Sequence, residues 1–187
     1  TFKKPFVIMD SEFTSWPGAQ QRGWTGEGEY REIVQIGAIK VDPHQCFTEV
    51  DSLNILVRPV INPQLSDYFT DLTHITQKQV DENGVLFEQA LQTFNNFCAA
   101  LDVWSDVWSY GRDDKVLLEN CRLYGLPEPD LGFSDVREVV RQCGVNPDGY
   151  TSGTVHQALG VHMTGHVHNA LHDCRSILAF LVDRYGE

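Results

Sequence analysis

Two carboxylates follow an apolar run near the start of the chain. In "FVIMDSEFTSW", residues 6–16, four apolar residues precede Asp10, and one residue separates Asp10 from Glu12. Side chains two positions apart in a strand lie on the same face of a sheet. Adjacent carboxylates repel each other unless one is protonated or a cation intervenes, and their hard oxygen atoms suit Mg²⁺ or Mn²⁺. The alternative is that Glu12 lies beyond the strand, in solvent.

A second acidic stretch is "SYGRDDKVLLENC", residues 109–121. It predicts a short strand that ends at Gly111, followed by a helix that opens with Asp113 and Asp114. Acids in the first turn of a helix are usually caps or partners of the helix dipole. By itself this stretch is therefore a weak indication of catalysis.

The third stretch is "HVHNALHDCRSILAFL", residues 166–181, which predicts an apolar helix with Asp173 near its start. His168 lies five residues earlier. Five helical steps turn through about 140°, so the two side chains converge only if His168 lies at or before the helix start. Histidine is the usual general base near neutral pH. The alternative is a surface histidine beside a solvated aspartate.

The elements that must position these residues can be read from apolar periodicity. Strands are expected at residues 6–10, 33–41, 52–59 and 106–111, and the turn-rich links between the first three indicate an antiparallel meander. Residues 61–81 predict short helical pieces, and residues 17–32 a mobile loop. Helices are expected around four apolar groups: Phe87 to Phe97, Leu117 to Tyr124, Val136 to Val140 and Leu171 to Leu181, with a short one around Val155. Strands followed by alternating helices and strands predict an α/β domain with a mixed sheet.

Composition limits the classes of protein. The 187 residues suit one domain, 1–187, with 42% hydrophobic and 21% charged residues. A net charge of −12 argues against binding nucleic acid or anionic membranes by bulk charge. The five scattered cysteines, without a CxxC pair, argue against a disulfide framework and fit a cytoplasmic protein. We expect no signal segment, and the four histidines after residue 161 lack the spacing of a zinc site.

Taken together, the three stretches resemble the DEDDh 3′–5′ exonucleases, the DnaQ-like branch of the ribonuclease H-like fold. The matching motifs are "DSE", "GRDD" and "HNALHD", and the last agrees at His168, Ala170 and Asp173. "DSEFTSW", "EIVQIGAIKV" and "VRPVINPQLSDYFTDLTHIT" are similar to the ERI-type and KapD-like subgroup. The resemblance spans residues 6–183. It implies a ribonuclease H-like mixed sheet flanked by helices.

The sequence departs from the family pattern at two residues and in one loop. The residue before the mid-chain aspartate is usually aromatic in the family, and here it is Asp113. This leaves the choice between Asp113 and Asp114 open. We favour Asp114, because Asp-x-x-Leu-Leu then falls as in relatives. His74 stands where relatives often have glycine and could narrow the nucleotide pocket. The loop at 17–32 looks longer than usual and could form a lid.

The resemblance also implies a mechanism. Two divalent cations, Mg²⁺ or Mn²⁺, about 4 Å apart would be held by four acids. His168 would take a proton from water that attacks the 3′-terminal phosphodiester, releasing nucleoside 5′-monophosphates from single-stranded RNA or DNA. The four acids are Asp10, Glu12, Asp114 and Asp173. The residues expected to hold the terminal nucleotide are Phe13, Thr14, Trp16, Leu72, His74 and Ile75.

Two other functions remain open at this point. One is a hydrolase of small oligonucleotides, and the other is a non-catalytic module that binds nucleic acid or protein on the same fold. The presence of all four acids and His168 favours an enzyme. The ERI-type resemblance favours RNA somewhat over DNA as substrate, although the contacts that would read a 2′-hydroxyl cannot be located from the sequence.

Overall fold

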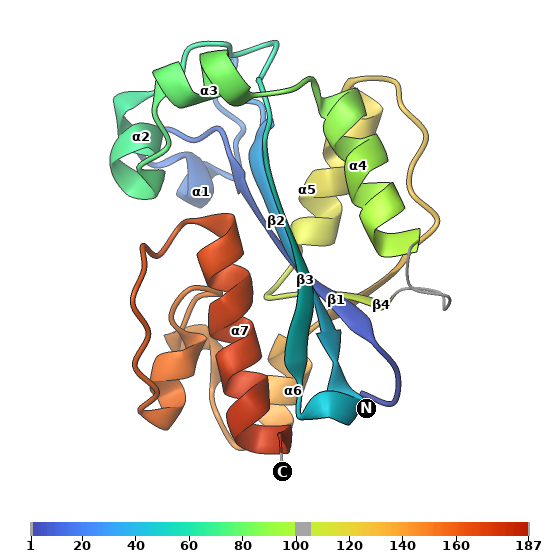
Figure 1. Ribbon diagram of the computed structural model, residues 1–187. Coiled ribbons are helices and arrows are strands. Elements are labelled where there is room, and N and C mark those ends of the chain that lie inside the picture. Colours follow the sequence, from blue (N-terminus) through green and yellow to red (C-terminus); the bar gives the residue numbers. More distant parts are fainter. Residues whose placement is uncertain (1, 100–105, 187) are drawn as a thin grey trace.

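The computed structural model describes residues 2–99 and 106–186. Its centre is a five-stranded mixed sheet with the strand order β3-β2-β1-β4-β5 (Figure 1). The antiparallel part joins β1 to β2 and β2 to β3, whereas β4 pairs with both β1 and β5 in parallel. The strands are β1 (Phe6–Phe13), β2 (Ile33–Asp42), β3 (Thr48–Leu56), β4 (Asp106–Ser109) and β5 (Gly132–Asp135). The predicted antiparallel meander with added parallel strands is confirmed.

Helices cover both faces of this sheet (Figure 1). In the view of Figure 1, α4 and α5 lie on one side of the sheet, and α6 and α7 lie on the other. The helices α1, α2 and α3 lie around the upper end of β2. Within the described residues, no helix is long and apolar enough to cross a membrane. The helices are α1 (Ala19–Arg22), α2 (Asp67–Thr73), α3 (Gln77–Asn83), α4 (Phe87–Ala99), α5 (Asp113–Leu123), α6 (Arg137–Gln142) and α7 (Ala170–Tyr185), with 3₁₀ turns at Pro43–Gln45, Pro147–Gly149 and Val155–Leu159.

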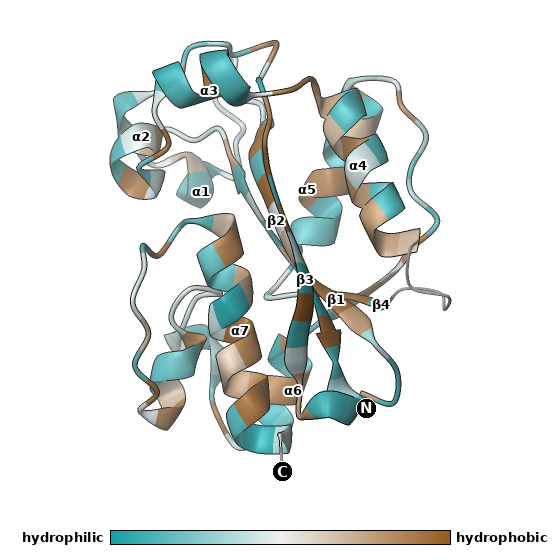
Figure 2. Ribbon diagram, viewed as in Figure 1, coloured by the Kyte–Doolittle hydropathy of each residue, from teal (hydrophilic) through white to brown (hydrophobic). Residues whose placement is uncertain are grey.

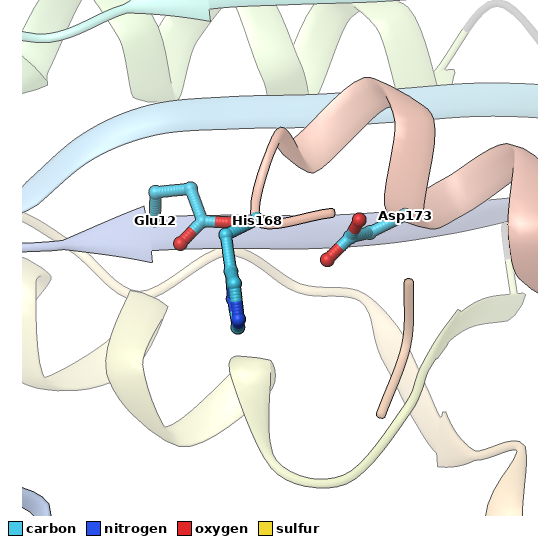
Figure 3. Close-up of side chains that lie close together, drawn as sticks. All are labelled: Glu12, His168 and Asp173. Atoms are coloured by element: carbon cyan, nitrogen blue, oxygen red, sulfur yellow. The ribbon is translucent and has the colours of Figure 1, made fainter. Parts of the chain in front are cut away.

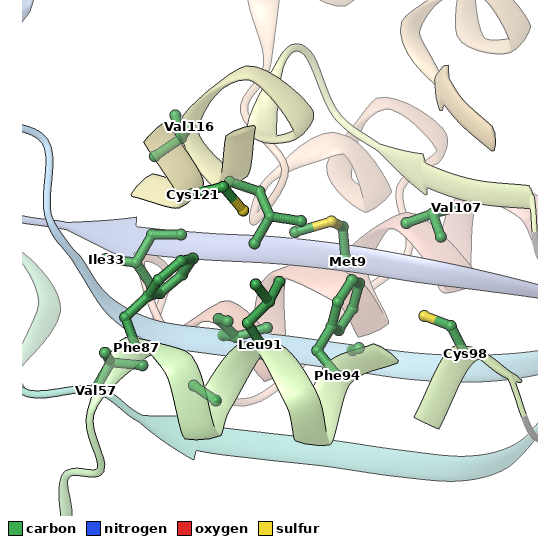
Figure 4. Close-up of a cluster of buried hydrophobic side chains, with 14 of the residues drawn as sticks. Met9, Ile33, Val57, Phe87, Leu91, Phe94, Cys98, Val107, Val116 and Cys121 are labelled. Carbon is green, nitrogen blue, oxygen red and sulfur yellow. The ribbon is translucent and has the colours of Figure 1, made fainter. Parts of the chain in front are cut away.

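Alternation along β1 divides the core into two layers. Val7 and Met9 pack with the apolar stripe of α4 and with α5, in the cluster drawn in Figure 4. Phe6 and Ile8 point the other way and pack with α6 and α7. The same division is visible in Figure 2, where the brown stripes of α4 and α7 face the sheet. Because β1 is buried on both faces, it is a rigid central strand on which functional groups can be mounted.

Three strands differ from the sequence-based expectation. β3 spans Thr48–Leu56, so it begins four residues before and ends three residues before the predicted 52–59. β1 continues to Phe13, three residues beyond the predicted end, because β2 pairs with it along its whole length. β5 (Gly132–Asp135) was not expected at all. It has only four residues, with the sequence GFSD, and its parallel pairing with β4 supplies the order that its composition does not. This strand matters because it leads directly into α6.

Candidate active site

Asp10 and Glu12 lie within β1 and continue the alternation of Phe6 and Ile8. Both therefore point to the face that α7 covers, and they are only 4% and 8% exposed. Opposite them on β2 are Gly37, paired with Asp10, and Gln35, paired with Glu12. The alternative in which Glu12 lies in solvent beyond the strand is wrong, since β1 extends past it.

The start of α7 is fixed to β2 beside these two acids. The buried Gln35 side chain accepts a hydrogen bond from the backbone N–H of Ala170 at 2.9 Å, which satisfies a donor that the helix itself leaves unpaired. The helix then crosses Gly37 so closely that a Cβ there would be 2.4 Å from the Ala170 carbonyl carbon. Only glycine permits this approach, and the approach brings Asp173, in the first turn of α7, over β1.

His168 lies two residues before the first residue of α7, with a left-handed backbone at φ 69°. The condition set by helix geometry is thus met, because His168 precedes the helix. In the view of Figure 3, the ring of His168 lies between Glu12 and Asp173. One ligand atom from each of these three residues lies within 4.8 Å of the other two. Burial, and then the nearby His166, lower the pKa of His168, which favours the neutral ring.

The mid-chain acid of the site is Asp113, and the preference for Asp114 is wrong. Asp113 is the first residue of α5 and accepts hydrogen bonds from the backbone N–H and the hydroxyl of Ser11, at 3.1 and 2.6 Å. Asp114 turns away to Arg112, which donates two hydrogen bonds of 2.8 and 2.7 Å to it. Successive helical residues point about 100° apart, so both acids cannot face one site.

The four carboxylates share a cavity with few donors. Burial is the largest cause that raises the pKa of each, and mutual repulsion adds to it: Asp10 and Glu12 rise well above their usual values, Asp113 to about 6 and Asp173 to about 7. Ser152 donates a hydrogen bond of 3.1 Å to Asp173 Oδ2, but among the described residues the buried Asp173 Oδ1 has no partner. Hard, crowded, under-satisfied oxygen atoms fit divalent cations.

A cavity of about 340 Å³ opens over these acids. Of the residues predicted to hold a nucleotide, Phe13 and Leu72 line it. The other four are not among the residues that line it, so for them a contact with the nucleotide stays a prediction. Thr14 is buried and bonded to the backbone of residues 30 and 32, and Ile75 belongs to a small core with Phe69. Trp16 is half-buried and lies three residues before the short α1 begins.

His74 ends α2 with a left-handed backbone at φ 61°, the conformation for which glycine is usually selected. Its ring stacks on that of His166, with ring centroids 3.6 Å apart, and His166 bonds through Nε2 to the Leu72 carbonyl at 3.0 Å. His74 therefore does not narrow the cavity as expected. It instead joins the end of α2 to the segment that carries His168.

Several residues of the cavity wall were not expected from the sequence. Trp24 belongs to the 17–32 loop. It packs edge-on against Phe13, and its indole N–H donates to the Thr14 carbonyl at 3.0 Å. The loop at residues 17–32 is thus part of the cavity wall. The other unexpected residues of the wall are Ser11, Ser15, Gln20, Tyr68, Phe69, Tyr110, Arg137, Tyr150, Thr151 and Ser152. They come from β1, from three helices and from the loops between elements, so only the folded chain brings them together.

Comparison with known proteins agrees with this geometry. The family described as Exonuclease (RNase_T) matches residues 7–181. ERI1 exoribonuclease 2 of Xenopus laevis is 28% identical over 94% of this chain, and the probable 3′-5′ exonuclease KapD of Bacillus subtilis (strain 168) is 30% identical over 67% of it. The aligned regions cover 27% and 57% of those two proteins, so the chain corresponds to part of the length of each.

Among solved structures, the nuclease domain of 3′hExo, a DEDDh family member bound to rAMP, superposes with a TM-score of 0.84. The match covers 98% of this chain and 92% of that one at 24% identity, and it confirms the predicted ribonuclease H-like fold. The family match extends over nearly all of the sequence, through every stretch that supplies an acid to the cavity. The chain therefore belongs to the exonuclease (RNase_T) family, and within it is similar to the ERI-type and KapD-like 3′–5′ exonucleases.

Proposed function

We propose that residues 1–187 form a single metal-dependent 3′–5′ exonuclease domain that acts on single-stranded ends and releases nucleoside 5′-monophosphates. The observation that carries this proposal is the convergence of four carboxylates and His168 on one cavity, with the buried Asp173 Oδ1 lacking a protein partner among the described residues. Four carboxylates without cations would repel a phosphate, so activity requires added charge.

The residues that would hold two Mg²⁺ or Mn²⁺ ions are Asp10, Glu12, Asp113 and Asp173. Divalent ions in such a site lower the pKa of bound water and stabilise negative charge on the leaving oxygen. The protein's own contribution is to keep the acids rigid. Asp10 and Glu12 are fixed by the paired strand β1, Asp113 by its two hydrogen bonds from Ser11, and Asp173 by Ser152.

His168 is proposed as the general base. Its neutral ring, favoured by the lowered pKa, can accept a proton from the attacking water on an imidazole nitrogen. It lies next to Glu12 at the mouth of the cavity, where a water near the acids would be within reach (Figure 3). A base held before the helix start, and not on the helix, can be placed there without disturbing Asp173.

The terminal nucleotide is proposed to lie against Phe13 and Leu72. These two side chains come from different elements of the cavity wall, β1 and α2, and offer apolar surface to a sugar and a base. Aromatic stacking on a base is tolerant of sequence, which suits an enzyme that removes each nucleotide in turn. RNA is the preferred substrate in this proposal, because the similar proteins from Xenopus laevis and Mus musculus are both called exoribonucleases.

The proposal is tested with 3′-labelled single- and double-stranded RNA and DNA, incubated with Mg²⁺, Mn²⁺ or EDTA. We expect release of labelled mononucleotides that requires the cation and is lost in Asp173→Asn. His168→Ala should lower kcat by about 100- to 10,000-fold and remove the acid limb of the pH profile, which lies below pH 6.5. Products longer than one nucleotide, or equal activity in EDTA, would refute the proposal.

A further inference from the structure

The wall of the cavity includes the cationic side chain of Arg137. Among the arginines and lysines of the described ranges, Arg137 alone lines it, facing a space that four carboxylates dominate. Arg137 is the first residue of α6, directly after the turn from β5. In a chain with a net charge of −12, a lone arginine in the wall of a proposed phosphodiester site needs an explanation.

The guanidinium is held in a fixed orientation. Asp135 accepts hydrogen bonds from Arg137 Nε at 3.0 Å and from Arg137 Nη2 at 2.7 Å, in a side-on pair. Gly111 lies beside this pair with a left-handed backbone at φ 100°, a conformation that favours glycine, and a Cβ there would be in ordinary contact with the Arg137 Cζ at 3.5 Å. The side chain is 32% exposed, and its pairing with Asp135 raises its pKa further, so it stays charged.

This pairing uses only one edge of the guanidinium. Arginine presents five N–H groups, and the Nε–Nη2 edge is occupied by Asp135. No hydrogen bond joins Nη1 to any described residue, so the Nη1–Nη2 edge is available. Such an edge matches two oxygen atoms of a phosphate, whereas a lysine ammonium would act only as a point charge.

The turn does not need the guanidinium for its own stability. Asp135 Oδ1 also accepts hydrogen bonds from the backbone N–H groups of Gly111 and Arg137, at 3.0 and 2.9 Å. These two bonds already join the end of β4 to the start of α6. Asp135 Oδ2 accepts from Arg137 alone among the described residues, so the carboxylate orients the guanidinium, and a charged group held rigidly in this way in a cavity wall suits a ligand contact.

The position of Arg137 indicates which phosphate it would meet. Phe13 and Leu72, proposed above for the terminal nucleotide, belong to the end of β1 and to α2. Arg137 follows β5, two strands from β1, or about 10 Å across the sheet. Within the cavity wall, Arg137 thus belongs to the β4–β5 edge together with Tyr110, whereas the acids are mounted on β1, α5 and α7.

We propose that Arg137 binds the first internucleotide phosphate on the 5′ side of the scissile one, through its free Nη1–Nη2 edge. The inference rests on the proposed exonuclease function and assigns a subsite within it. Arg137 would then recognise a polymer: a substrate with a single phosphodiester has nothing for it to bind, whereas an oligonucleotide does.

The test compares two substrates with Arg137→Gln. One is a single-stranded oligonucleotide of ten residues, and the other is the p-nitrophenyl ester of thymidine 5′-monophosphate, which has only the scissile phosphodiester. For the oligonucleotide we expect KM to rise about tenfold or more with little change in kcat. The slope of log KM against log salt should fall by about 0.7, the value for one phosphate contact to a single strand. The ester should be hydrolysed at the wild-type rate.

Two further variants separate this role from a structural one. Arg141→Gln is the matched control, because Arg141 lies on the same helix and pairs with Glu138 but is outside the cavity wall. It should leave both substrates unaffected. Arg137→Lys keeps the positive charge but lacks the two-nitrogen edge of the guanidinium. Its KM for the oligonucleotide should therefore lie between those of wild type and Arg137→Gln.

Each remaining outcome is decisive. An unchanged oligonucleotide KM in Arg137→Gln, or an equal loss on both substrates, overturns the subsite. A wild-type protein that hydrolyses neither substrate with Mg²⁺ or Mn²⁺ overturns the proposed function instead. Thermal unfolding of each variant, expected within a few degrees of wild type, shows that the kinetic losses are not losses of fold.

Discussion

The protein buries carboxylates in two regions, and it treats them in opposite ways. Glu32, just before β2, is fully buried and accepts hydrogen bonds from the backbone N–H groups of residues 60, 61 and 62 at 2.7, 2.8 and 2.6 Å. The Tyr124 hydroxyl donates a fourth bond at 2.5 Å. In the cavity over β1, by contrast, four carboxylates share donors from Ser11 and Ser152, and one buried oxygen of Asp173 has no partner among the described residues.

The difference separates a structural acid from a functional one. A carboxylate with four donors is compensated for its lost hydration, and Glu32 joins the loop before β2 to the segment after β3. The cavity acids are not compensated, which is why burial and mutual repulsion raise their pKa values. Burial alone therefore does not identify a catalytic acid. The deficit of donors does, because it is the deficit that a cation can fill.

The largest effect that this comparison predicts is on activity. Asp10→Asn removes a cation ligand and should lower kcat/KM by at least about 1,000-fold, or about 4 kcal/mol of transition-state stabilisation. With EDTA present, the same variant should unfold at no lower denaturant concentration than wild type, because one source of repulsion is gone. Mononucleotide release and urea unfolding measure the two quantities. Full activity in Asp10→Asn would contradict the assignment of these carboxylates as cation ligands.

The next effect distinguishes two neighbours in the sequence. Asp113→Asn should lower kcat/KM by about 100- to 1,000-fold, since Asp113 faces the other acids. Asp114→Asn is its matched control. It removes only the pair with Arg112, whose side chain is 53% exposed, and should change activity less than twofold and stability by under about 1 kcal/mol. The same mononucleotide assay checks both, and the reverse ranking would restore Asp114 to the site.

The acids of the cavity also show how far their positions can be predicted from the sequence. That Asp10 and Glu12 share a face could be predicted because a strand alternates with a period of two, whereas their grouping with Asp173 came from the resemblance to the exonucleases. The choice between Asp113 and Asp114 depends on a rotation of about 100° at the first residue of α5. The hydrogen bonds from Ser11 set that rotation, and Ser11 lies on a strand 102 residues earlier. No local pattern contains that information.

The wall of the cavity shows a second limit of the same kind. The mixed sheet and most helices follow from apolar periodicity, yet β5 is short and polar, and its existence depends on pairing with β4. Since β5 was not expected, neither was Arg137, which that strand delivers to the cavity. The side chains of Thr14 and Ile75 lie outside the cavity wall for a different reason. They stand beside recognised motifs, but each side chain is needed for packing or hydrogen bonding in the fold.

The donor deficit should also appear as a pH effect on stability in the chelated protein. The pKa values of Asp113 and Asp173 are about 6 and 7 in the folded state and near 4 when unfolded. Between pH 4 and pH 7 the folded state therefore holds more protons, so its stability falls as pH rises, by on the order of 5 kcal/mol for the two groups together. Urea unfolding in EDTA across this range measures the fall.

Cations should abolish this pH effect, because they stabilise the ionised acids and bind more tightly as pH rises. Asp173→Asn in EDTA should flatten the curve as well, since it removes one of the titrating groups. If wild type in EDTA gains stability from pH 4 to pH 7, the cluster is compensated by contacts within the protein, and the contrast with Glu32 disappears.

The smallest effect, and the one that completes the comparison, concerns Glu32 itself. Glu32→Gln replaces one acceptor oxygen with an N–H₂ group that faces backbone N–H donors, and the free energy of unfolding should fall by about 2 kcal/mol. The activity of the folded fraction should stay close to wild type, because Glu32 is outside the wall of the cavity. Urea unfolding and active-site-normalised kcat measure the two. This is the reverse of the pattern expected for Asp10→Asn, in which activity is lost and stability is kept. If both variants lost activity and stability together, hydrogen-bond satisfaction would not distinguish structural from catalytic acids in this fold.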